Sequence, residues 1–211
     1  IKTLAYPWML KAFDAFAVVG QRNRDYLRHY GVAESRIFDS PHAVDTDFFA
    51  RSAAVTDIAA VRRRLQTPEG HALLLYAGKF VAFKRISLLL DAAQRLKQRG
   101  RAIHVALVGA GPEAAALRIQ VAAAGLSACF TGFLNQNELP AVYAAADLLV
   151  LPSDGRETWG LVVNEAFACG TPTVVADAVG SAPDLIRPGL SVETFSGSAP
   201  DLVDAIDRVL E

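Results

Sequence analysis

From Ala72 onward, short apolar runs alternate along the chain with longer stretches of helical pattern. The runs are apolar throughout and partly β-branched, which predicts strands that are buried on both faces. The predicted strands cover residues 73–77, 103–108, 129–131, 148–151 and 173–176. The predicted helices between them cover residues 85–98, 112–124, 138–146, 161–169 and 182–186. Buried strands that are each followed by a helix indicate a doubly wound, Rossmann-like α/β domain with a parallel sheet.

Residues 1–70 do not continue this regular alternation. The pattern here predicts an apolar helix over residues 8–13, a β-like run over 15–19 and a polar helix over 21–30. A turn-rich segment follows over residues 38–45, and then a charged helix over 55–65. The opening residues are apolar, but Lys11 and Asp14 interrupt them, and the stretch is too short for a membrane span or a signal peptide.

The loops that follow the strands are where we expect chemistry, because ligands of a doubly wound sheet bind beyond the carboxyl ends of its strands. The loop after the first strand contains Gly78, Lys79 and Lys84. Glycine lets a ligand approach the backbone closely, and two ammonium groups beside helix amides are suited to a diphosphate. The alternative is that both lysines are solvated loop charges.

The loop after the second strand, from Gly109 to Ala114, matches the pattern GxGxxA. A dinucleotide-binding site would also need an acidic residue at the end of the next strand. That neighbourhood, residues 130–133, holds no acid. We therefore expect the glycines to form a tight turn into a helix that begins at Pro112, and an NAD-dependent dehydrogenase is disfavoured.

Two glutamates, Glu157 and Glu165, mark the loop and helix after the fourth strand. The helix from Leu161 is apolar nearly all round and should be buried, so the Glu165 carboxylate needs a partner. A ribose diol offers two hydroxyl donors to it, and Glu157 can accept from the hydroxyls of a sugar. Gly160 removes side-chain bulk from the helix N-terminus, whose amides favour phosphate. The alternative is that Glu165 pairs with a backbone group and that Glu157 is a solvated loop residue.

The composition argues against several other classes of protein. Hydrophobic residues make up 52% of the 211 residues and charged residues 20%, which is typical of a folded core rather than a disordered chain. The formal net charge of −1, without a basic patch, argues against a nucleic-acid partner. Cys129 and Cys169 match no metal-ligand spacing, and we interpret them as reduced core residues of a cytoplasmic protein.

The triplet Asp45-Thr46-Asp47 matches the DxD pattern that many transferases use to hold a divalent metal. It follows a proline turn and lies outside the predicted sheet. We therefore expect it to cap a helix or to form a turn, and we expect neither a metal nor another cofactor.

With these features the chain resembles the group 1 family of retaining glycosyltransferases, which have the two-domain GT-B fold. The resemblance runs from about Phe16 to the end of the chain and is strongest over residues 76–180. Its most specific element is the E-x7-E motif from Glu157 to Glu165, followed by Ala-Phe-Ala-Cys-Gly-Thr-Pro. The resemblance implies that Glu165 binds the ribose, and Glu157 the transferred sugar, of a nucleoside diphosphate sugar.

The other site residues follow from the same resemblance. Lys79 and Lys84 stand where the family has a basic pair, usually Arg and Lys, that holds the diphosphate, so the implied catalytic set is these two lysines and Glu157. Residues near Phe133 look like the segment that binds the base. The backbone amides that would meet the donor phosphates and the sugar are those around Trp159, Gly160, Leu161 and Val162.

Residues 41–47 resemble the family's interdomain segment, usually written Pro-Asn-Gly-Val-Asp. We therefore predict that residues 1–40 are the tail of an acceptor-binding domain and that 41–70 are the interdomain segment with the first helix. Residues 71–211 would be the domain that binds the nucleotide sugar. The sequence departs from the family at Lys79, where Arg is commoner, at Arg85, where Gly is usual, and at residues 180–184, where Gly-Ser-Ala-Pro-Asp replaces Gly-Gly-x-Pro-Glu.

The function that the resemblance implies is transfer of a sugar to an acceptor with retention of configuration and without a metal. Since most of the acceptor-binding domain is not in this sequence, we expect the chain alone to be inactive, and residues 1–20 either to mediate self-association or to be disordered. Peripheral membrane contact is considered only for the full-length protein. The alternatives are a nucleotide-sugar epimerase of the same fold and a non-catalytic α/β binding module, and the module would lack Glu157 and Glu165.

Overall fold

A six-stranded parallel sheet forms the centre of the molecule in the computed structural model, which describes residues 2–187 and 192–211. Its strands are β3 (Ala72–Ala77), β4 (Ile103–Val108), β5 (Ser127–Gly132), β6 (Leu148–Leu151), β7 (Thr173–Ala176) and β8 (Val192–Phe195). The strand order is β5-β4-β3-β6-β7-β8. The chain therefore leaves β3 toward one edge of the sheet and returns to β6 beside it before running to the other edge. The carboxyl ends of β3 and β6 are the switch point at which such sheets bind ligands.

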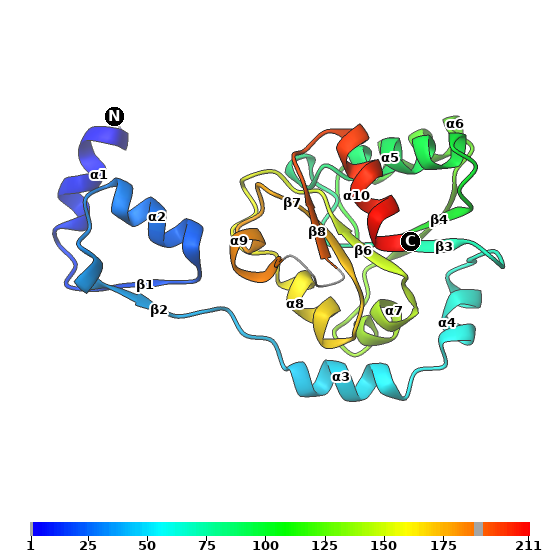
Figure 1. The fold of residues 1–211 in the computed structure, drawn as a ribbon, viewed down its shortest axis with the longest axis horizontal. Helices are drawn as coiled ribbons and strands as arrows, with labels where there is room; N and C mark the ends of the chain where they lie inside the picture. Colours follow the sequence, from blue (N-terminus) through cyan, green and yellow to red (C-terminus); the bar gives the residue numbers. More distant parts are fainter. Residues whose placement is uncertain (1, 188–191) are drawn as a thin grey trace.

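Helices cover both faces of this sheet (Figure 1). One face carries α5 (Ile86–Gln98), α6 (Ala114–Ala123) and α10 (Ala199–Leu210). The other carries α3 (Thr46–Ala54), α4 (Ile58–Arg64), α7 (Leu139–Ala145) and α8 (Leu161–Ala168), and the short α9 (Ala182–Leu185) follows β7. The central strands are fully buried because their side chains pack into an apolar cluster on each face. The predicted fold class, a doubly wound Rossmann-like domain, is confirmed.

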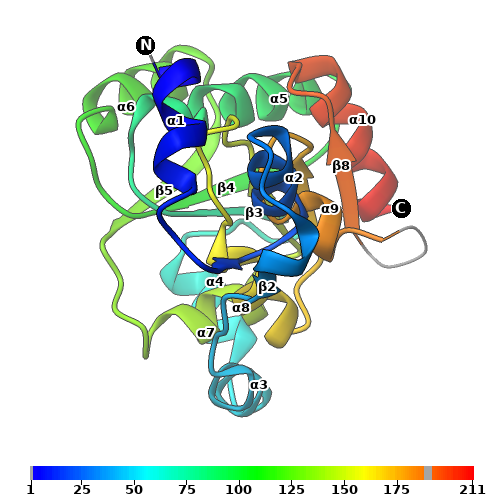
Figure 2. The same ribbon diagram turned by 90° about the vertical axis from the view of Figure 1, so that its left-hand side faces the viewer.

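Residues 2–39 form a smaller unit beside the domain, built from α1 (Lys2–Leu10), β1 (Phe16–Val18), α2 (Gln21–His29) and β2 (Ile37–Asp39). The two strands pair in parallel, and α2 lies next to α9 of the domain (Figure 2). Leu10, Val18 and Leu27 are among the five buried apolar residues that form its own small core. Trp8 stays 75% exposed on the same unit.

The predicted bounds of β4, β6 and β7 are confirmed residue for residue. Several other predicted elements were wrong in extent. The helix predicted over residues 8–13 ends at Leu10, where i→i+3 hydrogen bonds from Lys11 and Ala12 replace the helical pattern. The helix predicted from Pro112 begins at Ala114, since residues 112 and 113 form a turn.

The charged helix predicted over residues 55–65 is present as α4, but it begins only at Ile58, and α3 before it was not predicted. Asp45 caps α3 by accepting from the backbone N of Phe48 at 2.9 Å, and Asp57 caps α4 by accepting from Ala60 at 3.0 Å. Val55 lies between the two helices as the C-cap of α3. Capping by Asp45 confirms the prediction for the DxD triplet.

Strand β8 and helix α10 were not predicted, although Ser198 caps α10 by accepting from the backbone N of Asp201. Among the helices that the structure describes, none has the length and apolar character needed to cross a membrane.

Candidate functional site

The loops after β3 and β6 meet at the switch point of the sheet. The backbone N of Asp154, in the β6 loop, donates to the carbonyl of Phe83, in the β3 loop, at 2.8 Å. This hydrogen bond ties together the two loops that hold the predicted lysines and Glu157. The two loops are therefore fixed to each other at this point.

A cavity of about 550 Å³ opens at the carboxyl ends of β3 and β4 and reaches the helix that carries Glu165. Of the predicted site residues, four line it: Lys79, Phe133, Val162 and Glu165. Its walls otherwise consist mainly of small and apolar residues from the loops after β3 and β4 and from α7. A largely apolar cavity with a few polar groups is typical of a site for a small organic ligand.

Glu165 is half-buried and accepts a hydrogen bond from the hydroxyl of Tyr143 at 2.7 Å. Burial first, and then the charge of Glu165, raise the pKa of the Tyr143 hydroxyl well above its usual value. The hydroxyl therefore stays protonated and donates. The partner of Glu165 is thus a side chain, not the backbone group considered above, and the carboxylate keeps accepting capacity toward the cavity.

Helix α8 is less buried than its sequence predicted. Val163 and Ala166 face the core, whereas Leu161 is 39% exposed. The expectation of a helix buried all round was therefore wrong, because its first turn lies at the open carboxyl edge of the sheet. Gly160 precedes the helix with a left-handed φ of 89°, and no side chain caps the helix there. A helix N-terminus without a side-chain cap is suited to an anion.

Phe133 and Lys79 are both exposed at the cavity. The Phe133 ring is 81% exposed, which is unusual for a phenylalanine and leaves one face free for stacking. Lys79 is held through its backbone, since the hydroxyl of Tyr76 donates to the Lys79 carbonyl at 3.0 Å. Among the described residues, its side chain forms no ion pair.

Lys84 and Glu157 do not line this cavity but form an ion pair with each other near the N-terminus of α8, where Glu157 Cγ lies 3.7 Å from the position of a Cβ on Gly160. Their side chains are 16% and 13% exposed, so both charges are largely withdrawn from water. The buried hydroxyl of Ser153 also donates to the same carboxylate oxygen of Glu157, at 3.1 Å. The alternative that Glu157 is a solvated loop residue is therefore wrong, as is a solvated loop charge at Lys84.

The side chain of Trp159 points away from this cavity. It is buried, its Nε1 donates to Asn164 Oδ1 at 2.8 Å, and its ring meets that of His42 edge-on at 6.0 Å. Any contact of Trp159 with a ligand in the cavity would therefore run through its backbone.

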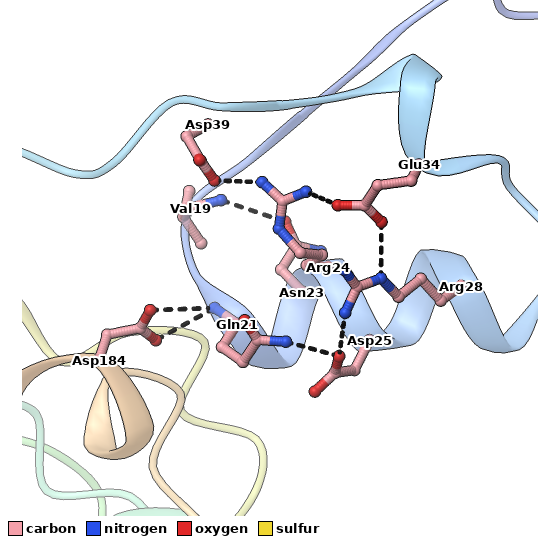
Figure 3. Close-up of polar contacts among 9 residues, drawn as sticks. All are labelled: Val19, Gln21, Asn23, Arg24, Asp25, Arg28, Glu34, Asp39 and Asp184. Carbon is pink, nitrogen blue, oxygen red and sulfur yellow. Dashed lines mark hydrogen bonds and ion pairs between the residues drawn. The ribbon is translucent and has the colours of Figure 1, made fainter.

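A second cavity, of about 570 Å³, lies between the N-terminal unit and the domain and includes Trp159 in its lining. The Asp184 carboxylate accepts from the backbone N of Gln21, at the start of α2, with 3.1 Å to each oxygen (Figure 3). On the same unit, Arg24 is paired with Glu34 and Asp39 (Figure 3). The contact between Gln21 and Asp184 attaches the start of α2 to α9 of the domain, whereas the two pairs of Arg24 lie within the N-terminal unit.

The GxGxxA pattern has a packing explanation. A Cβ atom on Gly109 would lie 1.9 Å from the carbonyl oxygen of Gly78, so the loops after β3 and β4 approach more closely than a side chain would allow. The described residues contain no group of three or more His, Cys, Asp or Glu arranged to hold a metal ion.

Two residues of this site were missed from the sequence, Tyr143 and Ser153. A half-buried carboxylate demands donors, and that demand was recognised for Glu165, but a tyrosine inside an apolar helix looked like core. Ser153 follows a buried strand by two residues, where its hydroxyl was not distinguished from an ordinary turn.

Comparison with known proteins decides the family. The family model for glycosyl transferases group 1 matches residues 57–211. The chain belongs to this family. The chain is 32% identical over 209 residues to the 2-deoxystreptamine glucosyltransferase of Streptomyces kanamyceticus, covering 97% of the chain and 53% of that enzyme. It is 38% identical over 200 residues to the D-inositol 3-phosphate glycosyltransferase of Geodermatophilus obscurus, covering 89% and 43%. The chain thus spans about half the length of the relatives it matches.

Solved structures of glycosyltransferases have the same fold as this chain. Anabaena HepE in complex with UDP and glucose superposes with a TM-score of 0.77 at 22% identity, covering 94% of this chain and 54% of that one. Sucrose-phosphate synthase from Thermosynechococcus elongatus superposes with a TM-score of 0.80 at 26% identity, covering 99% and 52%. The predicted family and the GT-B fold are confirmed.

Proposed function

We propose that this chain is the donor-binding half of a retaining glycosyltransferase that uses a nucleoside diphosphate sugar. The observation that carries the proposal is the arrangement at the switch point, where Lys79, Phe133 and Glu165 line one cavity and the Lys84–Glu157 pair joins the loops after β3 and β6. A complex of HepE with UDP and glucose, in a protein of the same fold, supports a uridine nucleotide as the first ligand to test.

The nucleoside would lie in the cavity of about 550 Å³. Its ribose diol would donate to the Glu165 carboxylate, which Tyr143 already orients from the other side. Its base would stack on the exposed ring of Phe133. The roles of these residues are inferred from their place on the cavity and from the family resemblance.

The diphosphate would lie toward Lys84, Lys79 and the N-terminus of α8 at Gly160, with Leu161 and Val162 in the first turn. Breaking the bond between sugar and phosphate leaves negative charge on the diphosphate. Ammonium groups and helix amides that are already in place can stabilise that charge without a metal. Glu157 would accept from hydroxyls of the sugar.

The acceptor would be bound by a second domain of the whole protein, and its hydroxyl would enter on the face from which the diphosphate leaves. Catalysis of this kind depends on bringing donor and acceptor together. We therefore expect no sugar transfer by the 211-residue chain alone.

Calorimetric titration of the chain with UDP, GDP and ADP tests the proposal. We expect saturable binding of at least one of them, unchanged by EDTA, and weaker and less salt-dependent in Lys84→Ala. Absence of binding of all three would contradict the donor-binding function. Loss of binding in EDTA would show that a metal takes part and would bring Asp45 and Asp47 back as candidate ligands.

A further inference from the structure

The pair formed by Lys84 and Glu157 brings together the two groups to which the proposed function assigns different parts of the donor. Lys84 would bind the diphosphate and Glu157 the sugar, yet in this structure the two side chains pair with each other. They lie 73 positions apart in the sequence and meet only because the loops after β3 and β6 are tied at the switch point. Ser153 holds the carboxylate from the side of the core.

This arrangement places one negative charge beside the cation that a diphosphate needs. Both side chains are more than four-fifths withdrawn from water, so solvent screens their interaction less than that of a surface pair. A diphosphate that approaches Lys84 must share the ammonium with Glu157 and is repelled by its carboxylate. The strength of that repulsion depends on the charge of the phosphate nearest to it.

The donor and the product of a transferase differ at that phosphate. In a nucleoside diphosphate sugar the terminal phosphate is esterified, and the sugar offers hydroxyl donors to a carboxylate. In the free nucleoside diphosphate the same phosphate gains an ionisation with a pKa near 6, as in other phosphate monoesters, and no sugar remains to satisfy Glu157.

We propose, on the basis of the function above, that Glu157 is an internal competitor for Lys84 that makes the site release the bare nucleoside diphosphate while it retains the sugar-bearing donor. When the sugar is present, its hydroxyls occupy Glu157 and leave Lys84 to the diphosphate. When the sugar has been transferred, the carboxylate recaptures Lys84. Glu157 therefore discriminates donor from product in addition to contacting the sugar.

The test compares the binding of UDP and of UDP-glucose to the chain and to Glu157→Gln, which keeps the shape and removes the charge. We expect UDP to bind about three- to tenfold tighter to the variant at pH 7.5. UDP-glucose should bind equally well or less well. If Glu157 had only a structural role, the substitution would weaken the binding of both ligands together.

Two further measurements make the result specific. The gain for UDP should shrink toward pH 5.5, where its terminal phosphate loses a charge. The gain in UDP affinity should also disappear when Lys84→Met is present, because no ammonium group then remains for Glu157 and the diphosphate to compete for. Glu193→Gln is the matched control, because it removes the carboxylate from a surface pair with Arg208 on the edge strand β8. It should change neither affinity.

Unchanged or weaker UDP binding by a folded Glu157→Gln would overturn the proposal, as would an equal gain for UDP-glucose. If Glu157→Gln does not fold, as judged by its thermal unfolding, Glu157→Ala gives the same comparison with the same expected direction. Failure of the unaltered chain to bind UDP, GDP or ADP would instead contradict the proposed function itself, and the inference with it.

Discussion

The two ends of the site differ in how their carboxylates are prepared for a ligand. At the end where we propose that the nucleoside binds, Glu165 is oriented by a neutral hydroxyl that cannot neutralise it, so its charge remains available to the cavity. At the end where we propose that the diphosphate and the sugar bind, Glu157 is already neutralised by Lys84 and held by Ser153. The E-x7-E motif therefore supplies two different carboxylates. Glu165 should bind a ligand directly, whereas Glu157 must first separate from Lys84.

The largest effect that separates the two ends is expected from Glu165→Ala. Losing a hydrogen bond to a charged group costs about 1.5–3 kcal/mol, so UDP should bind roughly 10- to 150-fold more weakly. Glu157→Ala, the matched substitution at the other end, should not weaken the binding of UDP. Titration calorimetry measures the UDP affinity of both variants. Equal losses of affinity would contradict the difference proposed between the two carboxylates.

A smaller effect is expected from Phe133→Ala. Stacking of a base on an aromatic ring contributes about 1–3 kcal/mol, and the lower end applies to a ring that is 81% exposed. The affinity for UDP should therefore fall about fivefold. Inorganic pyrophosphate, which has no base, should bind the variant and the unaltered chain alike.

Phe38→Ala is the matched control for Phe133, because Phe38 is 57% exposed on β2 of the N-terminal unit. It should leave UDP binding unchanged. An equal loss in both variants would mean that the ring of Phe133 does not contact the base.

The smallest effect is expected from deleting residues 1–35. Both ends of the site lie on the domain, and the N-terminal unit contacts it near Trp159 and Asp184, outside the cavity that holds Glu165. UDP affinity should therefore change less than about twofold, within the range of weak surface effects. The shortened chain should also be more monomeric in size-exclusion chromatography, since Trp8 and Phe13 leave with the deleted residues. A large loss of UDP affinity would show that the N-terminal unit completes the site.

The sheet was predictable from the sequence because β4, β6 and β7 are short runs of almost entirely apolar residues, which is typical of strands buried on both faces. Helix α3 was missed because its nine residues mix alanines and a phenylalanine pair with polar residues, so the cap at Asp45 was the clearer signal. The end of the domain was missed because β8 has only two buried residues, Val192 and Phe195.

The site also has a part that the sequence predicted and a part that it did not. The residue types and the spacing of Glu157 and Glu165 were visible in the sequence, and so was the need of a half-buried carboxylate for a donor. The pairing of Lys84 with Glu157 was not, because it depends on two loops that only the strand order brings together. The direction in which a loop side chain points, as for Trp159, is likewise set by its tertiary neighbours and could not be predicted from the sequence.

A crystal structure of the chain with UDP tests the central claim most directly. We predict the ribose hydroxyls within hydrogen-bond distance of the Glu165 carboxylate, the uracil on the ring of Phe133 and the diphosphate at Lys84. UDP bound instead in the cavity between the N-terminal unit and the domain, or at the opposite end of the sheet around Arg62 and Arg101, would contradict the account.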